Sequence, residues 1–508
     1  MNKYLVPTII ATVLVLALTA CGSAAGPAAE PQVLTIGQDL EARTLDPHGD
    51  IATLVTNYHR HMFNTLVRRS NDEKLELEGD LALSWENVDP VTWEFKLREG
   101  VKFHDGSELT AEDIKWNYDR MTDAELSLHV TGFVKTIDRV EVVDPLTIRI
   151  ITLEPDPVLP VRLTSGYIIP KKVFEEVGAE SFGLNPVGSG PFKFIEWVKD
   201  ERLVMEANPD YWEGPPQVDR LVFKPIPEVT TRMSALKTGD VDIVNKVPIQ
   251  EINAIKAESN LDVLTISGGR VVFYGFDTFH PPFDDVTLRQ AINYAVDVES
   301  ILENVLGGYG KRTLLAPEMY FGVDTSVEPY PYDPEKAKEL LAEAGYPGGE
   351  GLEFTIECAT SGNTPNDQEI TQAVAGELAK VGIKADVNLE EFGGFVRRWL
   401  DQEIRGMYCF SFGGVWLDMD VLMSSHFHSP RRALYYNTPE LDALIEEGMS
   451  FDLDARIAAY QKVTPVIKED APWLFMFAAD DIYGVNTRVK NWAPRSDEAL
   501  WLHPVEVE

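Results

Sequence analysis

Two aspartates and two histidines lie close together in "GGVWLDMDVLMSSHFHS", residues 413–429. If this stretch continues as a strand, Asp418 and Asp420 share one face and could cooperate as a carboxylate pair in acid–base or metal chemistry. The alternative is a capped turn into a helix, with both aspartates in solvent. A calcium loop would need more oxygen ligands and a glycine at its turn. His426 and His428 lack further zinc ligands at recognisable spacing, so the stretch predicts no metal site.

A second stretch with chemical potential is "PVGSGPFKF", residues 186–194, which could cradle a phosphate. Gly188-Ser189-Gly190 does not have the spacing of a dinucleotide-binding loop, and no Lys-Ser or Lys-Thr pair follows it. Pro191 removes a backbone donor, and a strand rather than a helix follows. We therefore predict a turn that leads into a strand. The chain also has no Gly-x-Ser-x-Gly elbow and no cysteine–histidine signature, so the usual marks of an enzyme are missing.

Aromatic residues cluster in the same part of the chain, and most of them are expected in the core because they follow strand or helix spacing. Trp416 is the exception. It follows Gly413-Gly414 at the end of a predicted strand, and α/β lobes bind ligands beyond the carboxyl ends of their strands. We therefore expect Trp416 to contact a ligand.

The elements that would position these residues change in character along the chain. Up to about residue 280, short β-branched and aromatic runs predict strands, and Thr110 with Asp113 has the spacing of a capping box for a helix over 109–121. From about residue 285, helices and strands alternate, which indicates βαβ units and a largely parallel sheet. The predicted joint is "DTFHPPFDD", residues 277–285. The alternating elements are helices at 286–306, 334–346, 367–382 and 392–404, and strands at 352–360, 383–390 and 406–412.

Composition limits the class of protein. The chain has 508 residues, 44% hydrophobic and 25% charged, which predicts a globular protein of two or three domains. Its formal net charge of −37 argues against nucleic acid and anionic membranes as partners. The charge serves solubility or the steering of cationic ligands. Cys358 and Cys409 could form a disulfide or remain two buried thiols, and no Cys-x-x-Cys pair occurs.

The N-terminus carries an export signal. Lys3 precedes an apolar run from Leu5 to Ala20, which is short for a membrane span. The run ends in "LTAC", which resembles a bacterial lipobox in which Cys21 becomes the lipid-bearing first residue. The alternative is a plain signal peptide. Residues 1–20 are thus predicted as a signal peptide and 21–31 as a tether, with the mature protein outside the cytoplasm, on the periplasmic face or outer surface of a bacterium.

Four blocks of sequence, behind Cys21, resemble the extracytoplasmic solute-binding proteins of ABC importers, in the peptide/nickel-binding group. The longest contains "PVGSGPFKFIEWVKDERLVMEANPDYWEGPP" and resembles the family's second signature over many residues. The resemblance covers nearly the whole mature chain. The four blocks span residues 81–120, 186–243, 281–310 and 332–346.

The resemblance implies an α/β, two-lobed clamp of the periplasmic-binding-protein type, with mixed sheets and an extra inserted domain. It implies a monomer that delivers a small solute or short peptide to ABC permease subunits, with no catalysis, cofactor or metal. The implied domains are domain I at 32–58, 186–274 and 483–508, domain II at 59–185 and domain III at 275–482.

The resemblance also implies ligand contacts, which we transfer from the family to this chain one position at a time. Peptide binders of the family hold the ligand amine with an aspartate where this chain has Val415, so amine capture would need Asp418 instead. No arginine occurs between Arg312 and Arg397, where some dipeptide binders bind a carboxylate. These departures favour a sugar, opine, amide or cationic solute over a free dipeptide. The expected ligand-binding residues are His48, Asp50, Tyr274, Asn363, Phe392, Trp399, Phe412, Gly414, Val415, Trp416 and Asp418.

Two other functions remain open from the sequence. An exported hydrolase would use Asp418 and Asp420, and a sensory or cell-wall-peptide receptor would use the same scaffold for signalling.

Overall fold

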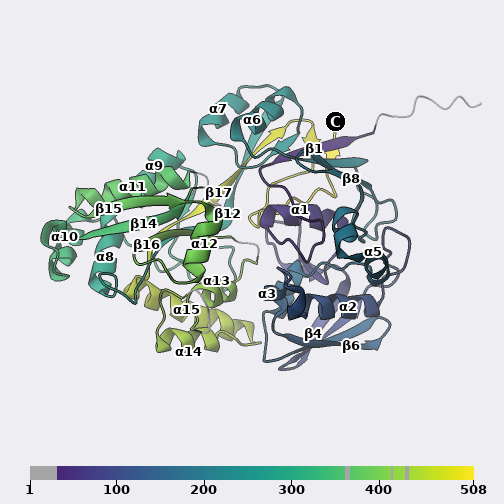
Figure 1. The fold of residues 1–508 in the computed structure, drawn as a ribbon, viewed down its shortest axis with the longest axis horizontal. Coiled ribbons are helices and arrows are strands. Elements are labelled where there is room, and N and C mark those ends of the chain that lie inside the picture. Colours follow the sequence, from purple (N-terminus) through teal and green to yellow (C-terminus); the bar gives the residue numbers. More distant parts are fainter. Residues whose placement is uncertain (1–30, 361–365, 414–415, 430–433) are drawn as a thin grey trace, which may run out of the picture. The chain divides into compact units, whose positions relative to one another are not determined.

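The computed structural model describes residues 31–360, 366–413, 416–429 and 434–508 (Figure 1). Residues 32–508 form one compact unit. Its largest sheet runs in the order β15-β14-β16-β12-β17-β11-β1-β10-β9-β8, with β13 (Lys311–Arg312) also paired to β17. The sheet is mixed, and helices accompany it at both ends, so the α/β prediction is confirmed.

The N-terminal end of this sheet is built from the short β-branched runs expected from the sequence. β1 pairs in parallel with β10, and β8, β9 and β10 form an antiparallel meander. The hydrophobic core that packs against these strands contains residues of α1 (Thr53–Met62) and of the C-terminal segment. The bounds are Val33–Gln38 (β1), Phe192–Val198 (β8), Arg202–Ala207 (β9), Arg220–Pro225 (β10), Ile243–Val244 (β11), Val229–Thr238 (α6) and Ile249–Lys256 (α7).

The other end of the sheet is the predicted α/β region. β14 pairs in parallel with both β15 and β16, and Figure 1 shows these strands side by side among helices. The expected helix 286–306 is two helices, because the chain is extended at Val296 and Asp297 caps the second helix. The bounds are Glu353–Ala359 (β14), Lys384–Glu390 (β15), Met407–Phe412 (β16), Val286–Ala295 (α8), Val298–Leu306 (α9), Pro334–Glu343 (α10), Asp367–Lys380 (α11) and Phe392–Leu400 (α12).

Two long antiparallel strands belong to both ends of the sheet. β12 (Leu261–Phe276) and β17 (Trp473–Asn486) pair along most of their lengths, with an irregularity between Ser267 and Val271. One end of β17 pairs with β11, whereas the C-terminal part of β12 pairs with β16. The predicted joint 277–285 instead packs within the α/β region, where the ring of Phe283 lies 5.0 Å from that of Phe276. Paired strands therefore connect the two ends of the sheet.

A separate four-stranded antiparallel sheet, in the order β4-β5-β7-β6, lies within residues 59–185. Helix α2 covers its core and begins at the predicted capping box, in which Thr110 and Asp113 bond reciprocally. The bounds are Ala82–Asp89 (β4), Thr92–Leu97 (β5), Ile137–Asp144 (β6), Thr147–Thr152 (β7), Ala111–Thr122 (α2), Thr131–Val134 (α3), Leu159–Arg162 (α4), Lys171–Leu184 (α5), and the hairpin Val67–Arg69 (β2) with Leu77–Gly79 (β3).

The Gly-Ser-Gly stretch is the predicted turn into β8. The Gly190 N–H donates to the carbonyl of Met62 at 2.9 Å, and Ser189 Oγ donates to Asn64 Oδ1 at 3.0 Å. A Cβ on Gly188 would lie 1.9 Å from the Met62 carbonyl oxygen, so only glycine fits.

The C-terminal third adds a helical layer against an aromatic core that includes Phe273, Trp399 and Trp473. Within the described residues, no helix is long and apolar enough to cross a membrane. In the same residues, no group of three or more His, Cys, Asp or Glu side chains is arranged to hold a metal ion. The bounds are Met419–His426 (α13), Pro439–Glu447 (α14), Leu453–Asp470 (α15), Val489–Lys490 (β18) and Glu506–Val507 (β19).

Candidate functional site

Trp416 lies where the segment after β16 meets residues 59–185. Its ring packs edge-on against Phe133 with centroids 4.5 Å apart, and its indole N–H donates to Ser165 Oγ at 3.3 Å. Its carbonyl accepts a hydrogen bond from Arg69 Nη2. Trp416 therefore bridges two regions of the chain, and its predicted contact with a ligand stays a prediction.

Asp418 and Asp420 are both buried, and each has an arginine partner. Asp418 caps α13 by accepting from the Asp420 N–H at 2.9 Å, and it pairs with Arg456 at 2.8 Å. Asp420 pairs with Arg162 at 3.0 Å, which also pairs with Asp156 at 2.6 Å. Burial raises the pKa of Asp420, although Arg162 opposes this. The capped turn weighed from the sequence is confirmed, but the aspartates are not in solvent.

The pair Arg162–Asp420 is a second bridge between residues 59–185 and α13. A third contact places the rings of Trp93 and Phe451 5.8 Å apart. Together with Trp416, these contacts join the four-stranded region to the C-terminal helical layer. We call this set the bridging contacts.

His48 and Asp50 hold the loop before α1. His48 is fully buried: its Nε2–H donates to the Tyr167 carbonyl at 2.8 Å, and its Nδ1 accepts from Arg120. Burial lowers the pKa of His48 to about 4, so the ring is neutral at pH 7. Asp50 accepts from the Arg43 N–H at 3.1 Å and from the Ala52 N–H at 3.3 Å. Both side chains therefore form hydrogen bonds that hold this part of the fold together.

The predicted aromatic positions divide into two groups. Tyr274 and Phe392 line one small cavity beside β16, and Phe392 is 39% exposed. Trp399 stacks on Phe410 with centroids 4.6 Å apart, and Phe412 meets His426 edge-on at 5.1 Å, so both belong to the aromatic core. Only the first group faces this cavity.

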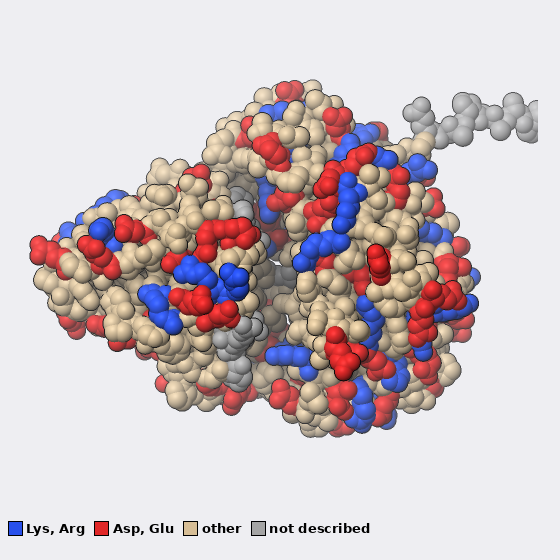
Figure 2. All heavy atoms as spheres, in the orientation of Figure 1, with Lys and Arg blue, Asp and Glu red and all other residues tan. Residues whose placement is uncertain are grey.

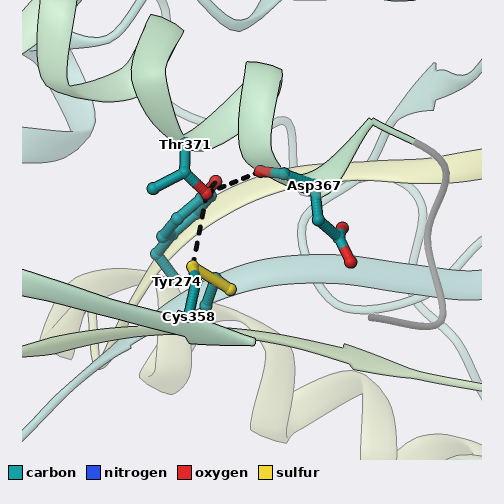
Figure 3. Close-up of a disulfide and its surroundings, with 5 residues drawn as sticks. Tyr274, Cys358, Asp367 and Thr371 are labelled. Carbon is teal, nitrogen blue, oxygen red and sulfur yellow. Dashed lines mark hydrogen bonds between the residues drawn. A yellow bond between two sulfur atoms is a disulfide. The ribbon is translucent and has the colours of Figure 1, made fainter. Parts of the chain in front are cut away.

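A disulfide joins Cys358 of β14 to Cys409 of β16, directly after the paired residues Glu357 and Tyr408 (Figure 3). The question left open by the sequence is thereby settled in favour of pairing. The Tyr274 hydroxyl lies 2.9 Å from Thr371 Oγ1, which donates to the Asp367 carbonyl at 2.7 Å. The disulfide therefore lies beside the small cavity and fixes the strand ends that line it.

A further cavity, of about 60 Å³, is lined by arginines that the sequence did not single out. It lies between α1, β2, the segment 164–167 and the C-terminal loop. The arginines and carboxylates of its lining are Arg60, Arg68, Arg69, Arg495, Asp80 and Asp497. These arginines come from distant parts of the chain, and no sequence motif connects them. We call this space the arginine cavity.

A larger cavity of about 420 Å³ shares Arg495 and Trp501 with the arginine cavity. Its other walls include Leu75, Ile266 and Trp492. The two cavities together combine basic and aromatic groups. Three predicted ligand positions, Asn363, Gly414 and Val415, and the predicted lipidation site Cys21 lie outside the described residues.

Residues 76–433 match the model of the bacterial extracellular solute-binding proteins, family 5. The chain belongs to this family. Heme-binding protein A of Haemophilus influenzae is 30% identical over 85% of this chain and 84% of its own length. A glutathione-binding protein of Pectobacterium atrosepticum is 28% identical over 91% of each chain.

Solved structures agree with this membership. HbpA2 from Haemophilus parasuis superposes with a TM-score of 0.81 at 25% identity, covering 94% of this chain and all of that one. The two-lobed fold of the periplasmic binding proteins, expected from the resemblance, is confirmed. As a family 5 protein, the chain is a solute-binding component of an ABC importer.

Proposed function

We propose that this family 5 protein encloses one solute between its lobes, presents it to the importer and releases it unchanged. The observation that carries this proposal is the set of bridging contacts, which hold the four-stranded region against the helical layer by way of Trp416 and Asp420. Side chains that touch across two regions are those expected of a clamp that closes around a ligand. β12 and β17 would act as its hinge, because they are shared by both ends of the main sheet.

Binding without catalysis is supported by the state of the two aspartates. A general acid–base pair must reach substrate, but Asp418 and Asp420 are buried and paired with Arg456 and Arg162. Their arrangement serves structure and bridging. This favours the binding protein over the exported hydrolase that the sequence left open.

We also propose that the protein has a lipid anchor and is a monomer. Cys21, at the end of the lipobox-like "LTAC", would carry lipid and tether the protein outside the cytoplasmic membrane through residues 21–31. The protein would act as a monomer, with one solute per chain. The solute itself is not fixed by the family, because the relatives named above bind heme and glutathione.

The proposal is tested by uptake in the bacterium that makes this protein. Solute recovered from the purified protein is radiolabelled and offered to cells that lack its gene. We expect uptake to be lost, and to be restored by the wild-type chain. A chain with Cys21→Ala should restore little uptake, because unanchored protein is diluted away from the permease. Normal uptake in cells without the gene would contradict the proposal, and a sensory receptor would give that result.

A further inference from the structure

The arginine cavity holds more positive than negative charge. Four arginines and two aspartates line it, in a protein whose overall charge is strongly negative. On the face drawn in Figure 2, acidic side chains (red) and basic side chains (blue) are intermixed. The arginines around this small space are therefore a local concentration of positive charge, which attracts a ligand of negative charge.

Two of the four arginines already have their counter-charges. Arg68 pairs with Glu78 at 2.8 Å and with Glu213 at 2.5 Å. Arg495 makes a bidentate pair with Asp497, at 2.9 Å and 2.7 Å. These two arginines build the walls of the cavity, and their charges are compensated within the protein.

Arg60 and Arg69 differ, because neither forms an ion pair within the part of the chain that the structure describes. Arg60 donates to two neutral side chains, Asn57 Oδ1 at 3.1 Å and Thr56 Oγ1 at 3.3 Å. Among the described residues, Arg69 donates to two carbonyls, those of Leu75 at 2.8 Å and of Trp416. Its Nε–H is buried without a hydrogen-bond partner among the described residues.

The position of Arg69 is electrostatically costly. Burial lowers its pKa, although Asp418 and Asp497 act in the opposite direction. Arg69 is half-buried, and its enclosed Nε–H without a hydrogen-bond acceptor is unfavourable unless an anion supplies one. Groups held in such unfavourable states gather at binding sites.

We propose that the arginine cavity binds an anionic group of the transported solute, a carboxylate or a phosphate, through Arg60 and Arg69. This inference rests on the proposed function and names the chemistry of its ligand. Guanidinium groups present paired N–H donors that match the oxygens of both anions. The hydroxyls of Thr164 and Ser165 lie in the same lining and add neutral polar groups.

The neighbouring cavity provides room for the rest of the solute. It shares the lining residues Arg495 and Trp501 with the arginine cavity, and its volume of about 420 Å³ has the size of a small-molecule site. Leu75, Ile266 and Trp492 offer apolar and aromatic surface, while Asp72 and Glu73 in the same lining disfavour a second anionic group. The solute is thus an organic anion with an apolar or aromatic body. Of the solutes favoured by the sequence on the basis of Val415 and the segment between Arg312 and Arg397, an opine carries such an anionic group, whereas a cationic or neutral sugar-like solute does not.

The test uses phosphate and succinate as probes, each titrated calorimetrically and in thermal unfolding against sodium chloride of equal ionic strength. Arg60→Gln and Arg69→Gln remove one guanidinium each, and Arg69→Lys keeps the charge without the planar fork. Arg149→Gln is the matched control, since Arg149 pairs with Glu94 on the four-stranded sheet. Circular dichroism confirms that each variant is folded.

We expect one probe or both to bind and stabilise the wild type, and the better probe identifies the phosphate or the carboxylate class. Its affinity should fall about ten- to a hundredfold in each glutamine variant. Arg69→Lys should recover part of that loss, and Arg149→Gln should bind as the wild type does. Stabilisation no greater than by chloride, or equal in wild type and glutamine variants, would overturn the inference. Recovery of a neutral solute from the protein would also overturn it, while leaving the proposed binding function intact.

Discussion

His61 is a buried neutral histidine whose surroundings leave no place for a charge. Its Nδ1–H donates to the Asn57 carbonyl at 2.5 Å, and its ring lies among those of Phe192 and Phe223. Burial lowers its pKa to about 3, well below the value of 6.5 expected in the unfolded chain. The folded state therefore binds fewer protons than the unfolded state between these two values.

We predict that this histidine weakens the fold as pH falls below about 6.5. Where only the unfolded state is protonated, the free energy of unfolding drops by about 1.4 kcal/mol for each pH unit. Urea unfolding at pH 7.0, 6.0 and 5.0 should show a smaller dependence on pH in His61→Gln than in wild type. Asp80, whose pKa burial raises to about 6, acts in the opposite sense, so the comparison is made between variants at each pH. Equal pH dependence in both proteins would contradict the assignment.

Gly188 offers a test of the turn before β8. We predict that Gly188→Ala lowers the free energy of unfolding by about 1–3 kcal/mol, because the new Cβ overlaps the Met62 carbonyl. Gly132→Ala is the control, since nothing lies within 4 Å of a Cβ at that position. Urea titrations of both variants measure the difference. If Gly188→Ala left the free energy of unfolding unchanged, this turn would not pack against the Met62 carbonyl.

At the level of single residues, the features that could be predicted are those that depend on neighbouring residues in the sequence. The capping box of Thr110 and the turn at Gly188 depend on neighbours in the chain, and both were predicted. The arginine partners of Asp418 and Asp420 come from distant residues, and so could not be foreseen. The arginine cavity was missed for the same reason, because Arg60 and Arg495 are brought together only by the fold.

At the scale of elements, the disulfide between β14 and β16 ties two neighbouring parallel strands across 51 residues of sequence. We predict that replacing both Cys358 and Cys409 by serine lowers the free energy of unfolding by about 4 kcal/mol, since the unfolded chain loses the constraint of a closed loop. Alkylation of the unfolded, unreduced protein should leave both cysteines unmodified. Modification of both under these conditions would show that the thiols are free.

Elements with strong periodicity agreed with the structure, and the α/β region was predicted strand by strand. β14, for example, lies within the predicted strand 352–360, and the alternation after residue 350 indicated the parallel pairing of β14, β15 and β16. The joint at 277–285 stays a prediction, and the long-range pairing of β12 with β17 was not predicted. Such pairing leaves no local mark in the sequence.

At the scale of the whole molecule, the bridging contacts should control how long a solute stays bound. We predict that Trp416→Ala speeds release of the co-purified solute about tenfold, because the contacts with Phe133 and Ser165 are lost. Stability against urea should change by less than about 1 kcal/mol, as Trp416 is only half-buried. Trp85→Ala, also half-buried but on β4, serves as the control. Stopped-flow fluorescence measures the release rates, and equal rates in all three proteins would argue against a clamp bridged by Trp416.

We propose above all that this family 5 protein binds a solute and leaves it chemically unchanged. Mass spectrometry tests this most directly, first on the native complex and then on the solute released by unfolding, after long incubation with the protein. We expect one solute per chain, with the released solute identical in mass and fragmentation to the solute that was added. A new product formed over many turnovers, and lost in Asp420→Ala, would contradict it and would identify an enzyme.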